Sequence, residues 1–336
     1  MNRRDLLAGM GLLALLPACA STRDGKAVLA SSAASFYDAR SGARLSRRQL
    51  LQRMAPTPIV LLGEVHDNRN HHRVRAGLLL DWVRSQPLRP AAIVFEHLDR
   101  EHNEALRLAQ VEPSQRGRNR KQEEGPSLLE LLDAARFDRD GWGWPAHLPL
   151  FEAAQASGAR WIAANLSRAS ARRLSREPDA AVEPVLQAML ESSRWSPEAQ
   201  QALSQALLQG HCNAIPAGVV ESIARVQRLR DAALALPLLD ASERRSLLLA
   251  GNGHVRRDHG VPLYLGALEK EALVVGFEEQ AVDAPAAGSA DLASVVGATR
   301  TLDISHAYDY VCLTMRAARE DPCADLKDLP KPPATT

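Results

Sequence analysis

Aromatic residues and net charge are both scarce in this chain. Only 4% of its 336 residues are Phe, Trp or Tyr, and 41 lysines and arginines nearly balance 40 aspartates and glutamates, which leaves a formal net charge of +1. The basic residues are spread rather than clustered, so the chain lacks the positive patch on which nucleic-acid binding depends, and we expect no nucleic-acid partner. The apolar share of 46% is still sufficient for a sizeable core.

Long hydrophobic runs are also missing, but a short one stands near the start. Leu6–Leu16 follows Arg3-Arg4, is too short to cross a bilayer, and leads into Pro17-Ala18-Cys19. This order predicts a lipoprotein signal peptide over residues 1–18, with Cys19 as the lipidated first residue of the mature chain. The next residue is alanine rather than aspartate, which favours the outer membrane. We therefore expect an exported, membrane-anchored lipoprotein that is periplasmic or surface-facing; an ordinary cleaved signal is the alternative.

Only three cysteines follow Cys19, namely Cys212, Cys312 and Cys323. An odd number in an oxidising compartment leaves one of them without a partner inside the chain. Cys312 and Cys323 are close in the sequence and could pair across a short loop, but the sequence leaves the disulfide state of all three cysteines open. Cys212 would then be free or able to bind a ligand.

Short apolar runs alternate with amphipathic segments along most of the chain. Six of the runs read as strands: Pro58–Glu64, Ala91–Glu96, Arg160–Asn165, Ser246–Gly251, Ala272–Phe277 and Tyr310–Thr314. The alternation predicts an α/β fold with a mostly parallel sheet flanked by helices. One stretch lacks strand signals and repeats Ala, Leu, Gln and Arg at helical spacing, which predicts an inserted small helical subdomain. The expected organisation is a signal (1–18), an N-terminal linker (19–48), an α/β domain (49–177 and 243–325), the helical insert (178–242) and a disordered tail (326–336).

Three of the expected strands end in residues that can carry chemistry. The first is followed by Gly63-Glu64-Val65-His66, the fourth by Gly251-Asn252-Gly253-His254, and the second ends at Glu96-His97. The carboxyl ends of parallel strands share one edge of the sheet, where ligands bind, so we expect these side chains to converge. Carboxylates and imidazoles together can hold a divalent metal, here Glu64, His66 and His254, or perform acid–base chemistry on water. Capping or loop roles are the simpler alternative for each residue alone.

Further candidates lie away from the strand ends. His211 and Cys212 are adjacent, and Gln227, Arg230 and Asp231 share one face of a predicted helix. Tyrosine and histidine both ligate haem iron, which draws attention to Tyr264 and Tyr310. A solvated helix face and packed tyrosines are the simpler explanations of these patterns.

Taken together, the motifs resemble the ChaN-like family. The resemblance covers roughly residues 50 to 325 and rests on Gly63-Glu64-Val65-His66-Asp67-Asn68 with His71-His72, Phe95-Glu96, His211-Cys212, Val226-Gln227 with Arg230-Asp231-Ala232, Gly251-Asn252-Gly253-His254 with Gly260-Val261-Pro262, and Asp309-Tyr310-Val311 with Asp321-Pro322-Cys323. It implies a haem-binding lipoprotein of haem and iron uptake, with an outer-membrane haem receptor and a homodimer as further implied partners. The haem-binding candidates are His66, His211, Gln227, Arg230, His254, Tyr264 and Tyr310. Because aromatics are scarce, we expect any haem to lie on an exposed surface or between two subunits rather than in a deep pocket.

The wider superfamily, with the Tiki proteases and the erythromycin esterases, implies a different activity. By matching motif, Glu64, His66, Glu96 and His254 would then serve a metal-dependent hydrolase, either a protease or an esterase, with a divalent metal as cofactor. The sequence leaves open whether the protein is an enzyme.

One geometric expectation follows from the parallel sheet. The strands that lead to Glu96 and His254 should neighbour the Pro58–Glu64 strand or lie one strand from it. The helical insert should lean over this edge and bring Gln227 and Arg230 toward it.

Overall fold

The computed structural model describes residues 34–88, 91–111, 125–177, 181–240, 245–266, 271–280, 291–320 and 323–324. The expected signal peptide, Cys19 and the expected tail at 326–336 lie outside these residues. Within them, the helices are all too short or too polar to cross a membrane.

An eight-stranded sheet organises the described part of the chain, in the order β2-β1-β8-β7-β3-β6-β4-β5. All contacts from β8 to β5 are parallel, whereas β1 runs antiparallel to both β8 and β2. The strands are β1 (Ser35–Asp38), β2 (Arg44–Leu45), β3 (Ile59–Leu62), β4 (Ala91–Asp99), β5 (Arg160–Asn165), β6 (Arg245–Leu249), β7 (Ala272–Gln280) and β8 (Tyr310–Met315). The predicted α/β fold and its six strands are confirmed.

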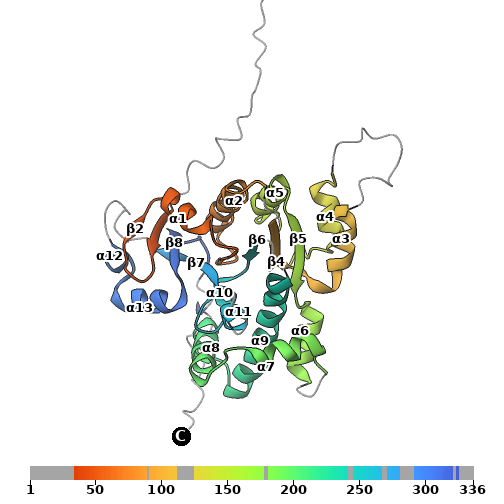
Figure 1. Cartoon of the computed structure of the whole chain (residues 1–336). Helices are drawn as coiled ribbons and strands as arrows, with labels where there is room; N and C mark the ends of the chain where they lie inside the picture. Colours follow the sequence, from red (N-terminus) through yellow and green to blue (C-terminus); the bar gives the residue numbers. More distant parts are fainter. Residues whose placement is uncertain are drawn as a thin grey trace, which may run out of the picture. The chain divides into compact units, whose positions relative to one another are not determined.

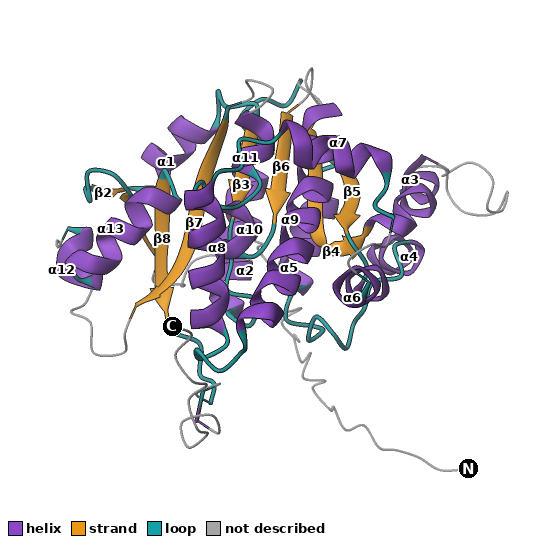
Figure 2. Ribbon diagram, turned by 90° about the horizontal axis from the view of Figure 1, so that it is seen from below, coloured by secondary structure: helices purple, strands orange, loops and turns teal. Residues whose placement is uncertain are grey.

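Helices cover both faces of this sheet (Figures 1 and 2). One face carries α1 (Arg47–Met54), α2 (Arg69–Arg84), α3 (Asn103–Val111), α4 (Leu128–Ala134) and α5 (Leu148–Ala156). The other carries α6 (Arg168–Arg176), α7 (Pro184–Ser192), α9 (Ala217–Asp240), α11 (Pro262–Gly266), α12 (Leu292–Val296) and α13 (Ala298–Ala307). The remaining helices are the single turn η1 (Arg100–His102), α8 (Pro197–Gly210), which pairs with α9, and α10 (Asn252–Val255).

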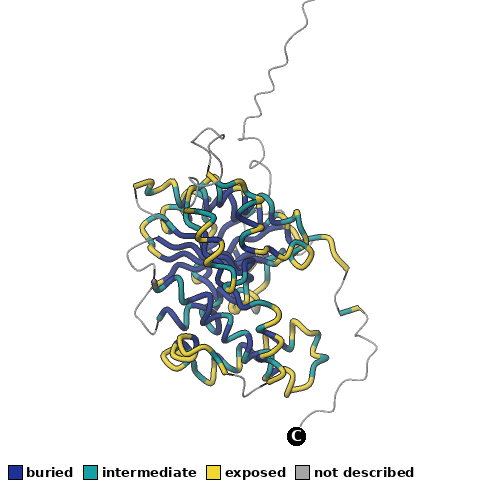
Figure 3. Tube along the Cα trace, turned by 90° about the vertical axis from the view of Figure 1, so that its right-hand side faces the viewer, coloured by how far each residue is buried: buried dark blue, intermediate teal, exposed yellow. Residues whose placement is uncertain are grey.

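The central strand β3 is apolar at every position because both of its faces are covered. In β3, Ile59 and Leu61 belong to the core under α9, and Val60 and Leu62 belong to the core under α2. Figure 3 shows the same pattern as a buried sheet between partly exposed helices. A strand of this kind can present polar residues only where it ends, which directs the chemistry of the chain to the edge of the sheet.

Part of the range 19–48, which we expected to be a linker, forms two strands of the sheet. Within that range Ser35–Asp38 forms β1, which pairs with β8, and Arg44–Leu45 forms β2. These strands are too short for an alternating pattern to stand out in the sequence, and their pairing with the last strand of the sheet is a long-range contact. The described part of the expected insert at 178–242 consists of α7, α8 and α9 with the loops that join them, but α9 does not stand apart. Its residues Leu229 and Ala233 share a core with the sheet.

The pairing of Cys312 with Cys323 that we considered from the sequence is wrong. Cys212 pairs with Cys323, their Cα atoms 5.7 Å apart, and so joins the loop after α8 to the segment after β8. Cys312 is a fully buried free thiol in the middle of β8, where strand pairing fixes it in the core. Closeness in sequence was therefore a poor guide to the pairing, because β8 holds Cys312 in the core, away from Cys323.

This cross-link should stabilise the fold measurably. We expect Cys323→Ser to lower the free energy of unfolding by about 2–4 kcal/mol, because a cross-link between distant residues restricts the unfolded chain. Urea denaturation under non-reducing conditions measures the loss. Cys212→Ser should cause the same loss, and the double variant no more. Additive losses, or no loss in either variant, would contradict the pairing.

Candidate functional site

The strand ends named from the sequence do meet at one edge of the sheet. β6 lies directly beside β3, and β4 lies on its other side, so the geometric expectation for these three strands is confirmed. Glu64 follows β3, Glu96 lies near the end of β4, and His254 lies in α10 after β6. Both glutamates are buried, with 2% and 3% of their surface exposed, so each requires a positive or hydrogen-bonding partner.

Glu64 is held by a buried arginine. Its Oε2 forms an ion pair with Arg75 of α2, and neither side chain is exposed. Its Oε1 lies 2.8 Å from Nδ1 of His66 and 3.1 Å from Nε2 of His97. Arg75 also donates to the carbonyl of Leu62, at 3.0 Å, which fixes the guanidinium against the end of β3. Burial lowers the pKa of Arg75 to about 9, so it still carries its charge at neutral pH.

Glu96 belongs to a second buried group of charges. One of its oxygens accepts from the backbone N–H of Gly251 at 2.6 Å, and the other lies 3.4 Å from Nε2 of His254. Nδ1 of His254 lies 2.6 Å from Asp231 of α9. Burial opposes charge on His254, but the carboxylates of Glu96 and Asp231 outweigh it and raise the pKa of His254 to about 10. For the acid Glu96, burial alone would raise the pKa. The neighbouring His254 and His66 instead hold the pKa of Glu96 well below its usual value.

His66 joins the two groups. Its Nδ1 faces Glu64, and its Nε2 lies 3.8 Å from Glu96. With 47% of its side chain exposed, it is the member of the set that solvent or a ligand can reach. Its ring lies edge-on to Trp142, with the ring centres 5.1 Å apart. The arrangement can therefore move a proton between a buried charge network and a molecule bound at the surface.

Glycine is required at two of the strand ends because side chains approach the backbone closely. A Cβ on Gly251 would lie 2.8 Å from Nε2 of His66, and one on Gly63 would lie 2.2 Å from Oδ1 of Asn252. Asn252 in turn exchanges two hydrogen bonds with the backbone of Phe277. Gly63 after β3 and Gly251 after β6 thus allow the two loops to pack against each other.

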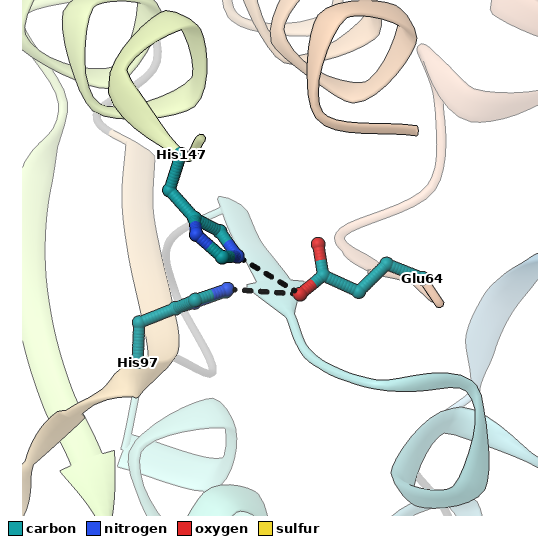
Figure 4. A group of neighbouring side chains, drawn as sticks. All are labelled: Glu64, His97 and His147. Carbon is teal, nitrogen blue, oxygen red and sulfur yellow. Dashed lines mark hydrogen bonds and ion pairs between the residues drawn. The ribbon is translucent and has the colours of Figure 1, made fainter. Parts of the chain in front are cut away.

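Two buried histidines also belong to the site: His97, which the sequence placed at a strand end without a role of its own, and His147, which we did not expect from the sequence. Nε2 of His97, in β4, and Nε2 of His147, before α5, lie 3.1 Å and 3.5 Å from the same oxygen of Glu64 (Figure 4). Burial lowers the pKa of His97 well below its usual value and that of His147 to about 3, so both are neutral at pH 7. The run Gly141-Trp142-Gly143-Trp144-Pro145 just before His147 was the available signal, since tryptophans are rare in this chain.

An open cavity of about 530 Å³ lies over this edge. Its lining includes His66, Glu96, His97, Trp142, His147 and, from α9, Arg230. Helix α9 thus reaches over the edge, as expected of the insert. Gln227 lines a neighbouring groove of about 370 Å³ instead, together with His211 and Arg230.

The two tyrosine candidates lie elsewhere. Tyr264 is buried in α11, with 1% of its surface exposed. Tyr310 begins β8 and lines a separate hollow together with Arg257 and His306. The seven haem candidates from the sequence therefore fall into several places: His66 and His254 at the sheet edge, His211, Gln227 and Arg230 at the groove, and the tyrosines apart.

The raised pKa of His254 has a consequence for stability. A histidine with a pKa near 6.5 when unfolded and about 10 when folded stabilises the protein fully below pH 6.5 and loses that contribution as pH rises through 10. The loss can reach about 5 kcal/mol for a shift of this size. We expect the gap in unfolding free energy between the native protein and His254→Gln to narrow across this range. Denaturant titrations at several pH values measure it, with His102→Gln as the control; a constant gap would disprove the charge assignment.

Comparisons with known proteins agree with this architecture. A structure of cofacial haem binding to ChaN of Campylobacter jejuni is similar, with a TM-score of 0.63 and 19% sequence identity over 84% of this chain and 97% of that one. A variant of the erythromycin esterase EreC is more distantly similar, with a TM-score of 0.41 and 12% identity over 85% and 99% of the two chains. None of the curated proteins is significantly similar in sequence. Residues 50–265 match the family described as haem-binding uptake, Tiki superfamily, ChaN, and the chain belongs to that family.

Proposed function

We propose that this protein binds haem on the groove between α6, α8 and α9, and serves haem or iron uptake as an exported, lipid-anchored protein. Membership of a haem-binding family supports the ligand. The signal pattern that ends at Cys19 supports the anchor. Fractionation of cells that produce the native chain or Cys19→Ser tests the anchor, since an unlipidated protein should leave the membrane fraction.

The groove combines an apolar floor with a row of arginines, and this combination carries the proposal. Ala171, Leu207, Ile223 and Val226 line its floor, while Arg168, Arg172 and Arg176 follow one another at four-residue intervals along α6. Four-residue spacing places these arginines on one face of the helix. Arg172 and Arg176 are exposed, and neither has an ion-pair partner among the described residues. A porphyrin needs an apolar surface for its ring and cations for its propionates, and the groove offers both.

His211 provides an iron ligand at the same groove. It follows the last turn of α8 and is exposed. Its Nδ1 donates to the carbonyl of Leu207 at 2.7 Å, which leaves Nε2 unprotonated and free to coordinate. A backbone acceptor on the opposite ring nitrogen commonly orients histidine ligands in this way.

The groove is open to solvent, so it would leave part of a bound haem uncovered. A shallow groove covers one face of a porphyrin and leaves the other uncovered, as the scarcity of aromatic residues led us to expect. A second haem-bearing copy of the chain could cover the free face. The ChaN structure from Campylobacter jejuni shows cofacial haem binding, which supports a homodimer of this kind.

Titration of the full-length protein with hemin tests the proposal. We expect a saturable shift of the Soret band that His211→Ala abolishes, because the iron loses its ligand. Arg172→Glu with Arg176→Glu should weaken binding roughly tenfold or more, because charge-assisted bonds to the propionates are lost. His102→Ala, in η1 away from the groove, is the matched control. Unchanged hemin binding in His211→Ala would exclude this site.

Hydrolysis of an acyl compound is the second candidate function, and the exposed His66 beside the cationic His254 favours it. When Nδ1–H of His66 donates to Glu64, its Nε2 can take a proton from water at the cavity. The water oxygen would attack the acyl carbon, and His66, which then carries the proton from the water, would give it to the leaving group. His254 would act only through its charge, since both of its ring nitrogens face carboxylates. Glu64 and Glu96 are both paired with cations, so they position the histidines rather than act as bases.

A chromogenic acyl ester such as p-nitrophenyl acetate tests this second function. We expect His66→Ala to lower kcat/KM by about a hundredfold or more, the usual effect of losing a proton-transfer group. His254→Gln should lower kcat/KM less, because it removes only a buried charge beside Glu96. His211→Ala should hydrolyse the ester as the native protein does. Hydrolysis no faster than in buffer, or unaltered by His66→Ala, would rule out this function.

A further inference from the structure

We propose that Glu64, His97 and His147 bind a divalent transition-metal ion of the zinc class. The site is separate from the haem groove and does not rest on the haem-binding proposal. It also differs from the set Glu64, His66 and His254 expected from the sequence.

The spacing of the three side chains matches a tetrahedral ion. Their ligand atoms all lie within 4.8 Å of one another. Nε2 of His97 lies 3.1 Å and Nε2 of His147 lies 3.5 Å from Oε1 of Glu64 (Figure 4). Zinc bonds to nitrogen and oxygen are about 2.1 Å long, so tetrahedral ligands stand roughly 3.4 Å apart. Two of the three separations are therefore already near the tetrahedral value, and the two histidine nitrogens, which lie within 4.8 Å of each other, would approach on binding.

His147 gives an independent reason to expect a ligand. Its residue is 1% exposed, and its Nε2, which points toward Glu64, has no hydrogen-bond partner among the described atoms. At 3.5 Å, Glu64 is too far to satisfy it. A buried polar atom without a partner costs about 1–3 kcal/mol, and coordination to an ion would remove that cost.

The surroundings hold each ligand in place. Arg75 occupies Oε2 of Glu64, so the ion would bind Oε1, which also faces Nδ1 of His66 at 2.8 Å. The ring of His147 stacks on His72, with the centres 3.9 Å apart, and His97 lies 4.6 Å from Trp142. Ligands fixed by neighbours in this way typify metal sites. His254, in contrast, is occupied by Asp231 and Glu96.

The site would open on one side. His97 and His147 line the cavity of about 530 Å³, and Glu64 lies behind them. Three protein ligands leave a fourth tetrahedral position for water or a small anion that enters from the cavity. An anion is favoured there because Arg75 already adds positive charge beside the ion.

Zinc titration of the full-length, chelator-treated protein tests the site. By isothermal calorimetry we expect one zinc ion per chain, and Co²⁺ in its place should give the absorption of a tetrahedral complex. His147→Phe and His97→Phe keep a ring in the packing but remove the ligand atom. Each should therefore lower the affinity for zinc by about tenfold or more. His102→Phe, in η1 away from the site, is the matched control and should bind zinc as the native protein does. His66→Phe tests the alternative ligand set and should bind zinc more tightly than either ligand variant, because it removes only a contact to Glu64.

Circular dichroism and cooperative urea unfolding report whether each variant is folded. Zinc should also raise the unfolding temperature of the native protein but not that of folded His147→Phe. The proposal is overturned if the native protein binds no zinc saturably. It is equally overturned if folded His97→Phe and His147→Phe both bind zinc as tightly as the native protein, or if His66→Phe loses zinc and these two retain it.

Discussion

The buried ion pair of Glu64 and Arg75 is the interaction on which the sheet edge depends. Both side chains are fully excluded from solvent, and each would be strongly destabilising alone, because breaking such a pair leaves an uncompensated charge in the core. Arg75 belongs to α2 and also binds the carbonyl of Leu62. It therefore joins the helix on one face of the sheet to the end of the central strand β3. His66 and His97 take their positions from the same carboxylate.

The residues at this edge of the sheet divide into a buried group of charges and one exposed histidine. Glu96, His254 and Asp231 form a charge network from which solvent is largely excluded, while His66 reaches the cavity. Such an edge can hold protons or an ion at fixed positions and still exchange with a bound molecule. The strands beneath make this possible, since their apolar segments fix the sheet while the end of β4 supplies Glu96 and His97.

The cavity and the groove proposed to bind haem share lining residues. Arg168 and Arg230 line both of them, and Asp231, next to Arg230 on α9, holds His254. Helix α9 thus contacts the groove, the cavity and the buried charges. A ligand that shifts α9 at the groove would act on the charge network through Asp231, which gives the two proposed functions a shared structural element.

The sequence by itself determined the parallel sheet, its six main strands and the meeting of Glu64, Glu96 and His254 at one edge. These follow from local patterns, since a strand buried on both faces must be apolar and must end before it becomes polar. Tertiary structure decided what depends on distant neighbours. Cys212 pairs with Cys323 because β8 holds Cys312 in the core, and β1 exists only through its pairing with β8. His147 joins Glu64 only because the chain before α5 folds back over β4, a contact between residues far apart in sequence that no local pattern encodes.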